Sequence, residues 1–76
     1  MSNELTIYKG MKFTYTLGDN TYLDCVLTVY EDKGNVLVKT FNVNPNGLSV
    51  LTTNIVSLKS FLDLMKLFKA EEVNES

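Results

Sequence analysis

The spacing of apolar residues changes once along this chain, near residue 54, and that change limits the folds open to it. Between Met11 and Leu17 apolar and polar side chains alternate, which is the pattern of a strand with one buried face. From Ile55 to Phe68 the apolar residues recur at helical spacing instead. The chain has 76 residues, which is room for one small domain. The sequence therefore predicts a single α+β domain in which the strands precede one helix.

Turn residues divide the strand region into four strands. Three short clusters rich in Gly, Asn and Asp are typical of hairpin loops: 18–20, 32–35 and 44–47. The predicted strands are 11–17, 22–31, 36–43 and 48–53. Consecutive strands with such short connections form an antiparallel meander. Residues 1–10 precede the 11–70 domain, either as a fifth edge strand over 5–8 or as a loose arm.

The predicted helix, residues 55–70, is more apolar around its circumference than one sheet requires. Asn54 is the expected N-cap, with Ser57 as a weaker alternative. The apolar arc spans about 180°, whereas a helix with one neighbour needs a stripe of about 100°. The surplus apolar surface predicts a homodimer formed through the helix. The predicted interface residues are Phe61, Leu64, Leu67 and Phe68. Residues 71–76 have no apolar pattern and are expected to form a disordered acidic tail.

The residue types missing from the chain remove most catalytic chemistry. It has no His, so it lacks the usual general base near neutral pH and any Ser-His or Cys-His pair. Its one cysteine, Cys25, lies among the alternating apolar positions of a predicted strand, which indicates a buried, inert thiol. A structural zinc site needs more Cys and His ligands than the chain contains. We therefore predict a protein that is not an enzyme and has no cofactor and no metal.

Cysteine usage and apolar run lengths indicate a compartment. A single cysteine, no visible signal peptide and no membrane-length apolar run predict a cytoplasmic protein that does not contact a membrane. The chain is rich in Asn and Lys and has no Arg, which is typical of AT-rich bacterial or phage genomes.

The sheet face away from the helix is the predicted binding surface. If the odd positions of the first two strands point at the helix, the other face carries tyrosines and lysines. The candidate partner-binding residues are Tyr22, Tyr30, Lys12 and Lys39. Tyr with Thr and Asn is a common composition for protein recognition. The leading hypothesis is a small homodimeric regulator or inhibitor that binds an unidentified partner protein.

The alternative is binding of single-stranded nucleic acid. Residues 11–70 are predicted to form four antiparallel strands and then a helix. In this order of elements they resemble the single-strand-binding domain of transcriptional positive coactivators and the Whirly proteins. That resemblance implies dimerisation through helices and binding of single strands over the sheet. The candidates for stacking on bases are Tyr22, Tyr30 and Phe41, and those for contacting phosphates are Lys12 and Lys39. The net charge of −2 and pI near 4.9 favour the protein partner, because nucleic-acid binders usually present a basic face.

Overall fold

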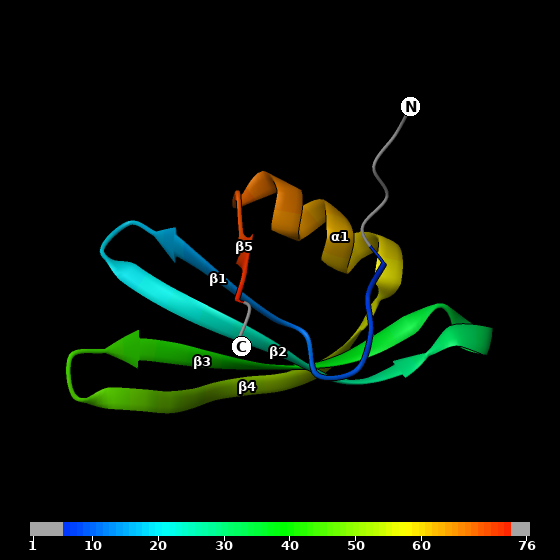
Figure 1. Cartoon of the computed structure of the whole chain (residues 1–76), viewed down its shortest axis with the longest axis horizontal. Helices are drawn as coiled ribbons and strands as arrows, with labels where there is room; N and C mark the ends of the chain where they lie inside the picture. Colours follow the sequence, from blue (N-terminus) through cyan, green and yellow to red (C-terminus); the bar gives the residue numbers. More distant parts are fainter. Residues whose placement is uncertain (1–5, 74–76) are drawn as a thin grey trace.

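The computed structural model describes residues 6–73, which form an open antiparallel sheet with one helix over one face (Figure 1). The elements in chain order are β1 Lys12–Leu17, β2 Asn20–Tyr30, the short 3-10 turn η1 Glu31–Lys33, β3 Asn35–Asn44, β4 Gly47–Ser57, α1 Leu58–Leu67 and β5 Glu71–Glu72. The predicted α+β fold, an antiparallel meander followed by a C-terminal helix, is confirmed.

The fifth strand comes from the C-terminal end of the described chain. The strand order is β4-β3-β2-β1-β5, so β5 adds to the outer edge of β1. Its residues Glu71 and Glu72 pair with Thr14 and Phe13. The prediction of a disordered tail is therefore wrong for Glu71 and Glu72, while 74–76 lie outside the described residues. Thr6 to Tyr8 form no strand, and the rest of the N-terminal arm, 1–5, also lies outside the described residues.

Aromatic and aliphatic side chains between α1 and the sheet form the core. Phe61 and Met65 of α1 are buried, as are Phe13, Val26 and Val36 of the sheet. The rings of Phe13 and Phe61 meet edge to face with centroids 5.7 Å apart. Edge-to-face aromatic pairs contribute about 0.5–1.5 kcal/mol beyond the area they bury. The helix is therefore attached to the sheet and not a separate rod.

A β-bulge in β2 decides which side chains face the helix. The pairing of β2 with β3 shifts between Val26 and Thr28, which leaves Leu27 as an extra residue. Side chains directly opposite each other across a sheet share a face, so Asp24, opposite Phe13, faces α1. The expectation that odd positions point at the helix is therefore correct in β1 but wrong for Leu23 and Cys25 of β2.

The helix begins later than its apolar pattern predicts. Asn54 lies within β4, and Ser57 is the N-cap: its side-chain oxygen accepts a hydrogen bond from the backbone N–H of Ser60 at 3.0 Å. The prediction of Asn54 as the N-cap is wrong, because residues 47–57 form strand β4 through their pairing with β3. Within residues 6–73, no helix has both the length and the apolar character needed to cross a membrane.

Candidate functional site

The sheet face opposite α1, which we call the open face, is covered by no described helix or strand (Figure 1). Strand alternation and pairing assign its members. From β1 and β2 it takes Lys12, Thr14, Thr16, Leu23 and Cys25; from β3 and β4 it takes Leu37, Lys39, Phe41, Val43, Leu48, Val50, Thr53 and Ile55. A second bulge, at Leu51, changes the alternation within β4, so Val50 and Thr53 share this face.

Large apolar side chains are contiguous across the open face. Leu23 lies opposite Phe41, and Phe41 lies opposite Val50. The β4 side chains are the most exposed, at 55% for Leu48, 59% for Val50 and 60% for Ile55. Contiguous apolar patches beyond a few hundred Å² are rare on monomeric proteins and mark interaction sites. The open face therefore has the composition of an interface.

Within β1–β4 the charged side chains on this face are both lysines, and Glu71 of β5, opposite Thr14, adds one carboxylate at its edge. Lys12 and Lys39 both lie opposite Cys25, one on each side, so the three form a row across β1, β2 and β3. The Lys39 ammonium lies 5.5 Å from the Phe41 ring centroid, within range of a cation–π interaction. The only carboxylate in these four strands, Asp24, faces α1.

The four predicted partner-binding residues do not form one cluster. Lys12 and Lys39 lie together on the open face. Tyr30 is on the same side but at the far end of β2, where it is exposed. Tyr22 faces α1, with its ring 5.6 Å from that of Tyr15. The aromatic ring beside the two lysines on the open face is Phe41 and not Tyr22. The alternation of β2 would have placed Tyr22 on the helix-facing side only if the bulge had been recognised in the sequence.

Cys25 also differs from its predicted environment. The sequence predicts a buried thiol on the core side, whereas the residue is half-buried and lies on the open face. The cause is the same bulge: before it, the side chains of β2 that face the helix are those of Tyr22, Asp24 and Val26.

The predicted helix interface is only partly accessible. Phe61 is buried against Phe13, and Phe68 stacks on Tyr15 at a centroid distance of 5.0 Å. Leu64 is 41% exposed and Leu67 is 72% exposed. These two leucines are what α1 offers to another chain.

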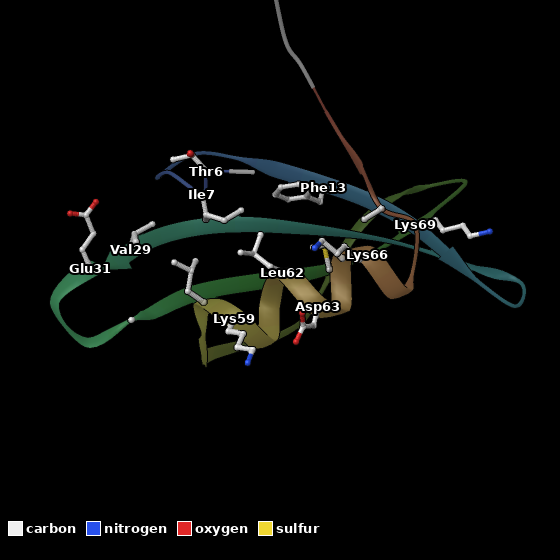
Figure 2. Close-up of a pocket in the computed structure, with 14 residues that line it drawn as sticks. Thr6, Ile7, Phe13, Val29, Glu31, Lys59, Leu62, Asp63, Lys66 and Lys69 are labelled. Atoms are coloured by element: carbon white, nitrogen blue, oxygen red, sulfur yellow. The ribbon is translucent and has the colours of Figure 1, made fainter. Parts of the chain in front are cut away.

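A groove of about 950 Å³ lies between α1 and the segment leading into β1 (Figure 2). Leu62 extends from α1 towards Ile7 and Phe13, while Lys59 and Lys69 point outwards. Glu31 and Asp63 also line it, so its charge is mixed. In the part of the chain that the structure describes, no group of three or more His, Cys, Asp or Glu side chains could hold a metal ion.

Among residues 6–73, Asp24 is the one buried polar side chain, and groups on the helix-facing side of the sheet satisfy it. It accepts hydrogen bonds from the Tyr15 hydroxyl at 3.1 Å and from the Thr40 hydroxyl at 2.7 Å. Burial raises the pKa of Asp24 above its usual range, and these two hydrogen bonds partly oppose that shift. Burial and the Asp24 charge both raise the pKa of Tyr15. The three groups bind one another, which is the arrangement of a structural network.

No family model, curated protein or solved structure matches this chain. The likeness to single-strand-binding domains therefore remains a likeness in the order of elements. Function has to be argued from the open face itself.

Proposed function

We propose that this chain is a non-enzymatic protein-binding module that acts as a regulator or inhibitor by covering a partner's surface with its open face. The observation that carries the proposal is the uncovered row of Leu23, Phe41 and Val50 across three neighbouring strands. Burying such side chains contributes about 25 cal/mol per Å² of apolar area. A partner with a complementary apolar patch would provide that burial.

The charge of the open face indicates the chemistry of the partner. Lys39 lies beside the apolar row with its ammonium over the Phe41 ring, and Lys12 lies in the same row as Lys39. Complementary charge across an interface sets orientation and suppresses wrong partners. We therefore propose a partner whose apolar patch carries acidic side chains, met in the reducing cytoplasm that a lone cysteine suits.

Photo-crosslinking from two matched aromatic positions tests the proposal. Benzoylphenylalanine replaces Phe41 on the open face or Tyr22 on the helix-facing side, and the proteins are irradiated in cells that produce the chain. Position 41 should give a heterologous adduct that position 22 does not. Adducts of two copies of this 8.6 kDa chain are separated by mass and set aside. Equal crosslinking from both positions, or none from 41, would contradict the proposal.

Charge reversal then tests how the partner is recognised. Lys39→Glu should weaken binding of the crosslinked partner at least tenfold, because it places a carboxylate against an acidic surface. Lys66→Glu, on α1, is the matched control and should leave binding unchanged. If both variants bind like the wild type, the acidic partner surface is wrong.

One observation favours a second candidate, single-stranded nucleic acid. Lys39 lies over Phe41, and Lys12 continues the same row, so a base-stacking ring and two cations lie on one uncovered face. Anisotropy of a labelled oligonucleotide at low salt tests it. Binding should disappear in Lys12→Ala/Lys39→Ala and persist in Lys59→Ala/Lys66→Ala. No binding by the wild type would leave only the protein partner.

A further inference from the structure

The two edges of the sheet differ in how much of their backbone is paired with another strand. Part of the β1 edge is covered by β5, whose acidic residues Glu71 and Glu72 pair with Thr14 and Phe13. The other edge is β4, which is hydrogen-bonded to β3 on one side and to no described strand on the other. β4 forms the lower border of the sheet in Figure 1. An exposed edge strand presents unpaired backbone N–H and C=O groups that can add another strand.

The β4 edge is long and carries few of the features that prevent pairing. It has 11 residues, none of them charged and none a proline. At about 3.3 Å per residue such a strand is roughly 36 Å long, close to the 38 Å longest dimension of the molecule. Edge strands in monomers are commonly protected by Lys, Pro, short length or bulges. Of these, β4 has only the bulge at Leu51.

We propose that β4 pairs with β4 of a second copy, antiparallel and about a two-fold axis, joining the two five-stranded sheets edge to edge. The bulge restricts the register. Leu48 and Val50 lie on the open face before it, and Thr53 and Ile55 after it. An axis between Leu51 and Thr52 places Leu48 opposite Ile55 of the second copy. The open faces of both copies then lie on the same side.

The same register explains why the partner is a second copy. It sets Leu48 opposite Ile55 on the open face and Ser49 opposite Asn54 on the helix-facing side, while Val50 meets the uncharged Thr53. Because β4 is uncharged, two identical strands meet without repulsion. A closed two-fold contact uses the same edge on both chains and leaves no free β4 edge for further growth.

The expected affinity follows from the size of the edge. A strand about 36 Å long and roughly 10 Å deep removes on the order of 700 Å² in total from two copies, below the 1,200–2,000 Å² of standard interfaces. The dimer should therefore be reversible, with dissociation in the micromolar range. This inference uses the β4 edge and goes beyond the proposed function, which uses the open face.

Sedimentation equilibrium of the full chain tests the pairing. The average mass of the wild type should rise from 8.6 kDa at low micromolar concentration towards twice that value at high micromolar concentration. A mass that stays at 8.6 kDa throughout would overturn the proposal.

A charge swap at two β4 positions tests the register. Val50 of one copy lies opposite Thr53 of the other, so Val50→Lys/Thr53→Lys sets like charges opposite each other and should give a monomer. Val50→Lys/Thr53→Glu alters the same two sites but sets opposite charges together, and should restore the dimer. Circular dichroism checks that both variants fold. If the two variants dimerise equally, β4 pairing in this register is wrong.

A helix variant separates this dimer from one formed through α1. Leu67→Lys places a charge at the most exposed leucine of α1 and should leave the dimer intact. If Leu67→Lys abolishes the dimer while Val50→Lys/Thr53→Lys does not, the contact belongs to the helix and the proposal is overturned. The crosslinking at Phe41, which lies on β3 one strand in from this edge, detects a heterologous partner and is judged independently of either outcome.

Discussion

At the scale of single residues, Asp24 shows how this small core tolerates a charge. Its carboxylate lies between Tyr15 and Thr40, on the helix-facing side of the two central strands. Burying an ionised group is costly, and hydrogen bonds from two hydroxyls offset part of that cost. Tyr15 in turn stacks on Phe68, so the hydroxyl that binds Asp24 belongs to a ring that also packs against the end of the helix.

We expect Asp24→Asn to match or exceed the wild type in free energy of unfolding at neutral pH. The amide oxygen still accepts from both hydroxyls, and the buried charge is removed. Burial raises the folded-state pKa of Asp24, so the folded protein binds that proton more tightly than the unfolded chain does. The wild type should therefore gain stability relative to Asp24→Asn as the pH falls through the raised pKa.

Urea unfolding of the two proteins at neutral and mildly acidic pH measures this difference. Asp24→Ala is the contrast, because it leaves both hydroxyls without their acceptor and should cost about 1–3 kcal/mol. A stability gap between wild type and Asp24→Asn that moves in the opposite direction with pH would show that the carboxylate is preferred in its charged form.

At the scale of elements, the start of α1 is set by competition between a strand and a helix. Residues 55–57 have helical apolar spacing, yet they pair with Leu37, Val36 and Asn35 of β3. Pairing with β3 satisfies their backbone groups along the whole edge, whereas a longer helix would leave that part of β3 unpaired. Ser57 then meets the requirement for an N-cap one residue before Leu58.

One serine variant and one asparagine variant distinguish the residue that caps the helix from the residue that belongs to the strand. We expect Ser57→Ala to lower the free energy of unfolding by about 1 kcal/mol, since the Ser60 N–H loses its acceptor. Asn54→Ala, at the position that the sequence favours as N-cap, should change stability by less than about 0.5 kcal/mol, because the residue is exposed in β4. Thermal and urea denaturation measure both values; a larger loss for Asn54→Ala would mean that it caps the helix in solution.

At the scale of the whole molecule, the two ends of the described chain meet around β1. The backbone N–H of Val73 donates to the carbonyl oxygen of Lys12 at 2.9 Å, and the Tyr8 hydroxyl donates to the Glu72 carboxylate at 3.0 Å. That carboxylate raises the pKa of Tyr8. The C-terminal segment therefore covers the first half of the β1 edge, whereas no described strand covers any part of the β4 edge.

Removing β5 should expose the β1 edge. A chain ending at Ala70 is expected to show faster amide hydrogen exchange in β1 than a chain ending at Val73, because strands β1 and β5 no longer pair. The matched truncation at Val73 retains every described contact of β5. Identical exchange in the two proteins would mean that β5 does not protect β1 in solution.

The sequence by itself determined the order and number of meander strands, their hairpins and the single helix, because alternation, turn residues and helical spacing act over a few neighbouring positions. Only the tertiary structure decided where β2 and β4 bulge, that Glu71 and Glu72 join the sheet, and which alternate of β2 faces the helix. Each of these depends on a strand distant in sequence. One extra residue in β2 transfers Leu23 and Cys25 to the open face and buries Asp24, so the composition of the binding surface follows from the register between strands.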